Sequence, residues 1–311
     1  MIELGDKVLR RLREAHFNRV ARGILATPPV PAASDGVVIF SMIGTKVLLP
    51  YLVAAKSFQA ALGRGRFVIL DDGTLTASDR DILARHVGDP AILPIAAVDT
   101  GACPKGGCWE RLLTLFELRR DDYVIQLDSD TVTLGPLPEV RAAIETGRDF
   151  TLRGEAQSAW APASSFSRDP ATLPPNFHVQ GAIEAVMGEA CAEVPGLTHY
   201  VRGCAGFAGF APGGLGRETA EAFCRSASGL LGPQRWAQWG SEQVMSNLVV
   251  SNEGEPVLLP YDRFLNFWNE PVGAEAAFVH FVGTYRFHRG AYAAAARQAI
   301  AALTAGLKAA A

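Results

Sequence analysis

The sequence contains no long apolar run. A membrane-spanning helix needs about 18 or more consecutive apolar residues, and the longest candidate, residues 47–55, is interrupted by Pro50. We therefore expect no transmembrane segment. The first residues are charged rather than arranged as a secretion signal, so we expect no signal peptide either.

An excess of positive charge is also absent. The 29 Lys and Arg residues and the 32 Asp and Glu residues give a formal net charge of −3, which provides no general attraction for nucleic acid. Cysteine is scarce, and its count of 5 is odd. This argues against a disulfide scaffold and for a reducing compartment, so we expect a cytoplasmic protein. The 49% of hydrophobic and 20% of charged residues are typical of a folded globular chain.

Short apolar strands alternate with helical segments from residue 37 onward. The expected strands are 37–40, 66–70, 91–95 and 123–127. The expected helices are 46–62, a segment capped by Ser78 and ending near residue 87, and 108–120. This alternation predicts an α/β fold with a mostly parallel central sheet flanked by helices. Ligands bind such sheets outside the carboxyl ends of the strands.

The two ends of the chain differ from this central part. Residues 4–22 form a pattern typical of a basic amphipathic helix, and residues 291–309 predict an Ala-rich terminal helix. We expect an ordinary solvated face for the first helix, with peripheral contact to an anionic membrane as the alternative. The expected segments are an N-terminal helix with a Pro-rich linker, one central domain and a C-terminal helix, at 1–35, 36–290 and 291–311.

Periodicity weakens after residue 150. Residues 153–180 are rich in Ser, Pro and Ala and predict a long, mobile, functional loop. The stretch GCAGFAGFAPGG, residues 203–214, predicts a strand whose glycines permit close backbone approach. FVHF, residues 278–281, predicts a further strand.

An acidic pair follows the apolar strand YVIQL directly. Asp128 and Asp130 stand two positions apart, and on an extended backbone such side chains point the same way. Two carboxylates at the carboxyl edge of a sheet suit Mg²⁺ or Mn²⁺ shared with a diphosphate. The D-x-D pattern is short, and a pair of turn or cap carboxylates is the alternative.

Seven motifs in this order resemble those of GT-A nucleotide-sugar glycosyltransferases, and most closely those of glycosyltransferase family 8. They are VVIF with LVAAKSFQAA, FVILDDGTLTASDRDIL, CWERLLTLFEL with YVIQLDSD, GCAGFAG, SEQVMSN, FLNFWN and HFVGTYR. The resemblance covers about residues 37–290. It implies a GT-A fold and metal-dependent transfer of a hexose from a nucleotide diphosphate sugar, a UDP-sugar, to an acceptor hydroxyl with retention. The acceptor is a carbohydrate or another hydroxyl compound.

The same resemblance assigns a metal and diphosphate site. Asp128, Asp130 and His280 match the metal ligands, with Mn²⁺ or Mg²⁺ as the cofactor. The imidazole favours Mn²⁺ because nitrogen is a softer donor than oxygen. Gly283 matches a glycine that lets the backbone approach the diphosphate. Arg286 stands where the family has a phosphate-binding Lys, and it keeps the charge while adding bidentate geometry.

Further residues are assigned to the rest of the donor. Ser129 is expected near the ribose, Arg111 at the donor sugar or its phosphate, and Gln243 beside the reacting anomeric carbon. Glu242 replaces the family's usual Asp. Ser41 opens the segment SMIGTK, which stands where the family has an acidic residue that reads uracil.

Two departures weaken parts of this assignment. The segment SMIGTK contains no acid, so uridine is less secure than a diphosphate leaving group. Cys204 stands where the family has Asn, so a contact with a sugar hydroxyl is lost or replaced.

Three other functions stay open. LDSDTV also fits the start of haloacid-dehalogenase-type phosphohydrolases, in which the first Asp is a nucleophile and the second an acid or base. A nucleotidyltransferase would share the acidic metal ligands but needs a basic, Gly-rich loop after the first strand. The third is a non-catalytic nucleotide-sugar-binding protein.

Structural roles are the alternative for single residues. His280 could be a core histidine, Gln243 a plain helix residue, and Arg111 a surface partner of Glu110 or Glu117. Several aromatic residues suit either the core or stacking on an acceptor sugar: Trp160, Phe166, Trp236 and Trp239.

Overall fold

The computed structural model describes residues 4–172, 174 and 177–310. The expected terminal segments and the expected 153–180 loop therefore include a few positions outside the described residues, namely 1–3, 173, 175, 176 and 311. The chain divides into two compact units. Unit 1 comprises Met1–Pro94, Ile125–Arg141 and Pro260–Ala311, and unit 2 comprises Ile95–Val124 and Ala142–Leu259.

Unit 1 is built on strands that run as almost continuous apolar segments. In the order β4-β1-β2-β3 these are Tyr123–Leu127, which begins in unit 2, Val37–Ile43, Arg66–Asp71 and Ala91–Pro94. β1 pairs with β2 and β2 with β3, both in parallel. β4, β1 and β2 are almost entirely buried, which explains why they lack polar alternation, whereas β3 is only partly buried.

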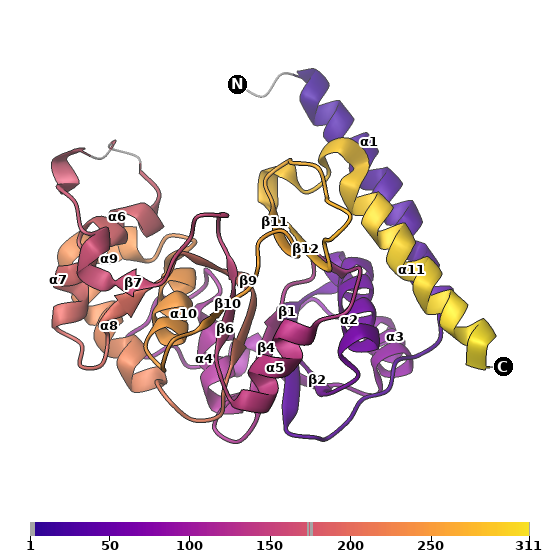
Figure 1. Cartoon of the computed structure of the whole chain (residues 1–311), viewed down its shortest axis with the longest axis horizontal. Coiled ribbons are helices and arrows are strands. Elements are labelled where there is room, and N and C mark those ends of the chain that lie inside the picture. Colours follow the sequence, from indigo (N-terminus) through magenta and orange to yellow (C-terminus); the bar gives the residue numbers. More distant parts are fainter. Residues whose placement is uncertain (1–3, 173, 175–176, 311) are drawn as a thin grey trace. The chain divides into compact units, whose positions relative to one another are not determined.

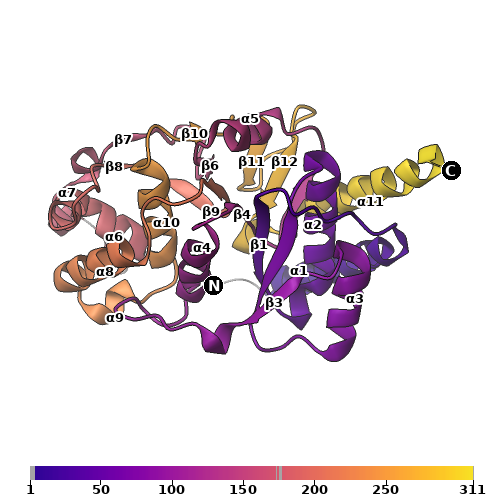
Figure 2. The same ribbon diagram turned by 90° about the horizontal axis from the view of Figure 1, so that it is seen from below.

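Helices α2 (Leu48–Leu62) and α3 (Ala77–Val87) pack together beside these strands (Figure 2). The predicted cap of α3 is wrong. Thr76, not Ser78, is the N-cap: its hydroxyl accepts a hydrogen bond from Asp79 N at 3.2 Å, and its own N–H donates to Asp79 Oδ2 at 2.9 Å. This reciprocal capping box satisfies two backbone donors and moves the cap two residues earlier.

A small second sheet and the two terminal helices complete unit 1. The sheet has the order β11-β12-β5, with bounds Phe264–Phe267, Phe278–Phe281 and Thr131–Thr133. Helices α1 (Leu4–Ala21) and α11 (Ala291–Ala310) lie side by side (Figure 1). The Phe17 ring of α1 stacks on Tyr292 of α11 with centroids 3.8 Å apart, and Tyr292 stacks on Phe281 at 4.5 Å. Both terminal helices thus share the core of unit 1.

Unit 2 contains strands β10, β6 and β9 of the seven-stranded sheet, whose order is β10-β6-β9-β4-β1-β2-β3, and most of the remaining helices. β6 (Phe150–Arg153) runs antiparallel to β9 (Gly203–Phe210) and parallel to β10 (Val257–Leu258). The helices are α4, α6, α7, α8, α9 and α10, at Trp109–Leu118, Val179–Ala185, Met187–Ala192, Arg217–Leu231, Pro233–Trp236 and Ser241–Ser251. Helix α5 (Pro138–Thr146) begins in unit 1 and ends in unit 2.

The glycines of β9 allow the close approach that the sequence predicts. A Cβ at Gly203 would lie 2.4 Å from Thr151 Oγ1, and one at Gly209 would lie 2.1 Å from Phe150 Cε1. Any side chain there would clash with β6. The long segment before β9 is partly ordered, because β7 (Ala161–Pro162) pairs with β8 (His199–Tyr200). Its mobility stays a prediction.

The architecture confirms the predicted fold class, α/β with a mostly parallel central sheet flanked by helices. None of the described helices combines the length and the apolar character needed to cross a membrane.

Candidate metal and nucleotide site

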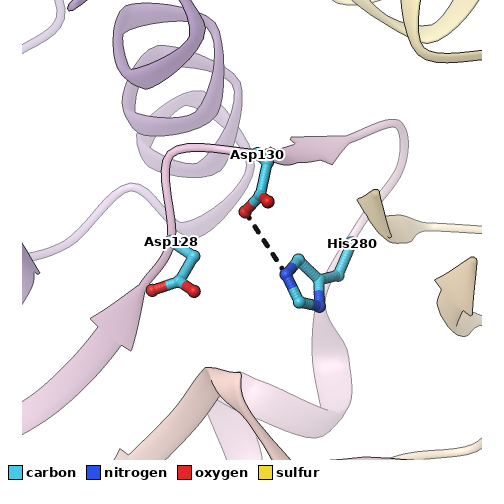
Figure 3. A group of neighbouring side chains, drawn as sticks. All are labelled: Asp128, Asp130 and His280. Carbon is cyan, nitrogen blue, oxygen red and sulfur yellow. Dashed lines mark ion pairs between the residues drawn. The ribbon is translucent and has the colours of Figure 1, made fainter. Parts of the chain in front are cut away.

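Two distant segments of unit 1 bring the predicted metal ligands together. Asp128 and Asp130 lie in the turn between β4 and β5. β12 pairs antiparallel with β5, and this register places His280 opposite Thr131, the residue after Asp130. The three side chains meet in Figure 3, although about 150 residues of chain separate the acids from the histidine.

The three side chains offer ligand atoms that all lie within 4.8 Å of one another. The His280 Nε2 to Asp130 Oδ1 distance is 3.3 Å (Figure 3). Asp130 and His280 are buried, with exposed fractions of 7% and 5%, whereas Asp128 is half-buried. Asp130 and His280 thus form the buried side of the cluster, and Asp128 forms its more accessible side.

Asn266 orients the histidine. β11 pairs parallel with β12 and sets Asn266 beside His280, where His280 Nδ1 lies 2.9 Å from Asn266 Oδ1. With the amide oxygen accepting, Nδ1 carries a proton and Nε2 is the nitrogen that faces Asp130. Metal-binding histidines are commonly held in this way by a second partner. Asn266 belongs to the FLNFWN motif, and its place beside His280 depends on this strand register.

Asp130 is kept ionised by its neighbours. Burial by itself would raise the pKa of the carboxyl, but the charge and hydrogen bond of His280, together with Arg286, lower it below its usual 3.8. Arg286 Nη2 contacts Asp130 Oδ2, and Arg286 Nε donates to the Phe281 carbonyl at 3.2 Å. An ionised, firmly held carboxylate is the form that binds a metal ion.

The residues present fit a divalent cation. Ligand distances of about 2.0–2.2 Å allow two ligands of one ion to lie up to about 4.4 Å apart, so small side-chain shifts would close the cluster. Two carboxylates and an imidazole suit Mn²⁺, and oxygen donors alone suit Mg²⁺. Among the described residues, this is the group of His, Cys, Asp and Glu side chains that could hold an ion.

Several contacts hold the D-x-D turn in place. Thr131 Oγ1 donates to the Asp128 carbonyl at 2.9 Å, and Tyr292 OH donates to the Ser129 carbonyl at 3.2 Å. Burial, and then the charge of Asp130, raise the pKa of Tyr292, so its hydroxyl stays a donor. Ser129 itself is half-buried. Gly283 is exposed at φ +29°, with open space where a Cβ would stand.

Ser41 lies at a buried position of β1. Its side chain is 1% exposed, and its hydroxyl donates to the Leu127 carbonyl at 2.6 Å. A hydroxyl in that position links β1 to the end of β4, directly before Asp128. Ser41 is thus bonded to the residue that precedes the D-x-D turn, and its contact with a nucleotide stays a prediction.

Arg111 and Glu242 form a buried ion pair inside unit 2. Arg111 Nη2 lies 3.3 Å from each Glu242 carboxylate oxygen, and the two side chains are 7% and 4% exposed. Arg111 is therefore not the surface partner of Glu110 or Glu117 that the sequence left open. The substitution of Glu for the expected Asp at position 242 keeps a carboxylate for this arginine.

Helix α10 ties unit 2 together through its first residues. Ser241 Oγ accepts from Trp109 Nε1 at 2.9 Å, and Gln243 Oε1 accepts from Ala205 N at 3.2 Å. Asn247 Nδ2 donates to the Gly203 carbonyl at 3.2 Å. Gln243 is half-buried, so part of its amide is accessible. Cys204, the departure in β9, is buried.

The four aromatic residues considered for acceptor stacking differ in their burial and contacts. Trp236 is fully buried, and Phe166 packs edge-on against Tyr200 at 5.0 Å. Trp160 stacks on His199 at 4.2 Å and donates from Nε1 to the Ser251 carbonyl at 2.8 Å. Trp239 differs, because 71% of its surface is exposed, two residues before α10 begins.

No protein-family model matches the sequence, and no curated protein sequence matches it. Solved structures similar to this chain have low sequence identity. The bifunctional glycosyltransferase WbbM is 14% identical with a TM-score of 0.49, over 82% of this chain and 47% of that one. This chain therefore spans about half of the WbbM chain.

Two further similar structures match over almost their whole length. The galactosyltransferase LgtC, in complex with donor and acceptor sugar analogs, is 15% identical with a TM-score of 0.46, over 87% of this chain and 95% of that one. Mouse xyloside xylosyltransferase 1 is 10% identical with a TM-score of 0.44, over 80% and 97%. All three are glycosyltransferases.

Proposed function

We propose that this protein is a GT-A glycosyltransferase that uses a divalent metal ion, Mn²⁺ or Mg²⁺. It would transfer a hexose from a UDP-sugar to an acceptor hydroxyl with retention. The observation that carries the proposal is the convergence of Asp128, Asp130 and His280 at the carboxyl end of β4. Ligands bind α/β sheets at such edges. The ordered motifs of the sequence support the UDP-sugar and the stereochemical outcome.

The diphosphate end of the donor is assigned to unit 1. A divalent ion held by Asp128, Asp130 and His280 would neutralise the charge of the departing diphosphate. Arg286 is held at Asp130 and can offer its other guanidinium N–H groups to phosphate oxygens. Its charge persists at any pH near neutrality. Exposed Gly283 would allow the phosphates close to the backbone, and Ser129 would lie by the ribose.

The sugar end of the donor is assigned to Gln243, Arg111 and Glu242. The Gln243 oxygen is occupied by Ala205 N, so its amide N–H groups can donate to the sugar beside the anomeric carbon. Arg111 would contact the donor sugar or its phosphate, and Glu242 would hold the guanidinium in place. Glu242 is thus a positioning residue, while Gln243 is the proposed catalytic one.

The acceptor side is assigned to the exposed indole of Trp239. Sugar rings present apolar faces that stack on aromatic rings, and His178 holds the indole edge-on at 6.0 Å. Trp239→Ala should raise the acceptor KM and leave donor hydrolysis unchanged, whereas Trp239→Phe should retain the acceptor KM. Equal acceptor KM values in the alanine variant and the wild type would remove Trp239 from the acceptor site.

The alternative function, a haloacid-dehalogenase-type phosphohydrolase, requires Asp130 to act as a general acid. The charges of His280 and Arg286 favour the ionised form of this carboxyl, which opposes proton donation. No contact of the described residues favours that function over glycosyl transfer. A non-catalytic binding protein would bind the nucleotide sugar without releasing nucleoside diphosphate, so a turnover measurement distinguishes it from the enzyme.

The test is a panel of UDP-, GDP- and ADP-sugars incubated with the protein and Mn²⁺, with release of free nucleoside diphosphate as the readout. We expect release from a UDP-sugar, its loss in Asp130→Asn, and retention in Asp149→Asn, a buried acid of unit 2. Binding of the nucleotide sugar without release, across a range of acceptors, would identify a binding protein instead. Release that persists in Asp130→Asn would refute the metal site.

A further inference from the structure

Helix α1 carries a strip of exposed apolar side chains. Val8, Leu9 and Leu12 are 52%, 44% and 63% exposed, which sets them among the most exposed large apolar side chains of the described residues. Later in the same helix, Phe17 and Ala21 are 1% and 0% exposed. The helix is therefore anchored through Phe17 and Ala21, and its apolar residues between positions 8 and 12 are exposed.

The exposed strip lies on the opposite side of the helix from the buried face. Successive helical residues turn by about 100°, so Val8, Leu9 and Leu12 share an arc of about 100°. Phe17 and Ala21 point away from this arc, toward α11. Figure 1 shows the start of α1 (indigo) reaching beyond the start of α11 (yellow). The strip is thus a second apolar face rather than a continuation of the packed one.

Basic side chains border the strip. Arg11 is exposed and Arg13 is half-buried. By the same helical geometry, Arg11 flanks the strip on one side and Arg13 on the other. Five basic and two acidic residues give α1 a net charge of +3, whereas the whole chain carries −3. The positive charge of the helix is therefore a local feature.

We propose that α1 binds peripherally to the surface of an anionic lipid bilayer. Helices with an apolar strip between rows of Arg or Lys lie in the interface with the strip in the acyl boundary, and the arginines reach the anionic headgroups. A second copy of this chain fits less well, since two α1 helices would bring like charges together. Phe17 stacks on Tyr292, so a bound α1 would hold unit 1 at the membrane.

The test uses the full chain and sedimentation with vesicles of phosphatidylcholine alone or of equimolar phosphatidylcholine and phosphatidylglycerol. We expect binding to the anionic vesicles only, weakening as salt is raised. Arg11→Ala with Arg13→Ala should lower the partition coefficient by roughly fivefold for each arginine. Leu9→Ser with Leu12→Ser should lower it by about tenfold or more.

Two control variants match these changes in type. Leu25→Ser alters another exposed leucine, 42% exposed and outside the strip, and Arg225→Ala removes an exposed arginine from α8 of unit 2. Both should bind vesicles like the wild type, and all variants should unfold thermally as the wild type does. Sedimentation velocity without lipid reports self-association.

The outcomes separate the proposal from its rivals. No binding to anionic vesicles overturns it, as does binding that survives both α1 double variants. Wild-type dimers that are lost in Leu9→Ser with Leu12→Ser, without vesicle binding, would assign the strip to a second copy and also overturn it. Anionic binding lost in the α1 variants and kept in the controls supports it.

Discussion

Two buried aspartates of this protein, Asp130 and Asp149, have pKa values shifted in opposite directions because their charged neighbours differ. Asp130 and Asp149 are 7% and 4% exposed, so burial favours the neutral acid in both. At Asp130 the charges of His280 and Arg286 outweigh burial and lower the pKa. At Asp149 burial, reinforced by the negative charge of Glu253, raises the pKa to about 7.

The difference lies in how the neighbouring cation is shared. Arg119 Nη1 donates to Glu253 Oε1 at 2.9 Å, and Arg119 Nε donates to the Ala211 carbonyl at 2.9 Å. The Arg119 guanidinium thus pairs directly with Glu253. Asp149 Oδ1 instead accepts a hydrogen bond from Ala211 N at 2.7 Å. A buried carboxyl with cationic neighbours of its own stays ionised and available to a metal ion. A buried carboxyl that shares its cation with another acid is more readily protonated, and here it accepts a hydrogen bond from the backbone.

The largest expected effect concerns a third buried carboxylate, Glu242, which has its own arginine. Arg111→Met should destabilise the protein by about 3–5 kcal/mol, because it leaves a buried charge without its partner. Arg120→Met, which removes an exposed arginine paired with Glu117, should cost less than about 1 kcal/mol. Denaturant unfolding measures both. Equal, small losses would show that the buried pair contributes little to folding.

The next effect is a pH dependence of stability. The folded-state pKa of Asp149, about 7, exceeds its usual 3.8, so the folded protein binds more protons than the unfolded chain between these values. The Asp149 contribution to stability should fall as pH rises through this window, by at most about 1.4 kcal/mol per pH unit. Asp149→Asn should remove this slope. A wild-type slope left unchanged in the variant would contradict the protonated state.

Asp130 should show the opposite sign. Its folded-state pKa is lowered, so its contribution is fully present above pH 3.8 and is lost as pH falls through the lower, folded-state pKa. Asp130→Asn should therefore lower the free energy of unfolding at neutral pH. In strong acid, the variant and the wild type should have similar stability. The same denaturant titrations, run at acid and neutral pH, measure this contrast.

The smallest expected effect is on metal affinity through Asn266. Asn266→Ala should weaken Mn²⁺ binding by about tenfold, because the imidazole loses the partner that orients it. Asn266→Asp keeps an acceptor oxygen and should retain the affinity. Asn247→Ala, a buried asparagine of unit 2, is the matched control. Electron paramagnetic resonance of free Mn²⁺ reports each affinity, and an unchanged value in Asn266→Ala would refute the orienting role.

Local patterns were enough to predict the strands that position the candidate metal ligands. YVIQL and FVHF are short apolar runs that became β4 and β12, and the D-x-D pair follows the first of them. The resemblance to glycosyltransferases named the same three ligands that the structure brings together. Apolar periodicity reports burial, so it locates strands well.

Long-range partners could not be predicted in this way. Arg111 and Glu242 are 131 residues apart, and nothing in either neighbourhood marks them as a pair. The role of Asn266 depends on the register of β11 against β12. The hydrogen bond of Ser41 to the Leu127 carbonyl joins strands β1 and β4, which are neighbours in the sheet but far apart in the sequence. The Thr76 cap was within reach, because Thr76 and Asp79 have the spacing of a capping box.

The most direct test of the central claim is a calorimetric titration of UDP into the wild type, Asp130→Asn and Asp149→Asn, each with Mn²⁺ and with EDTA. The claim is that Asp128, Asp130 and His280 hold the ion that binds the diphosphate. We predict that the wild type and Asp149→Asn bind UDP only with Mn²⁺, and that Asp130→Asn loses this binding by more than about a hundredfold while staying folded. Equal UDP affinity with and without Mn²⁺, or Mn²⁺-dependent binding retained in Asp130→Asn, would contradict it.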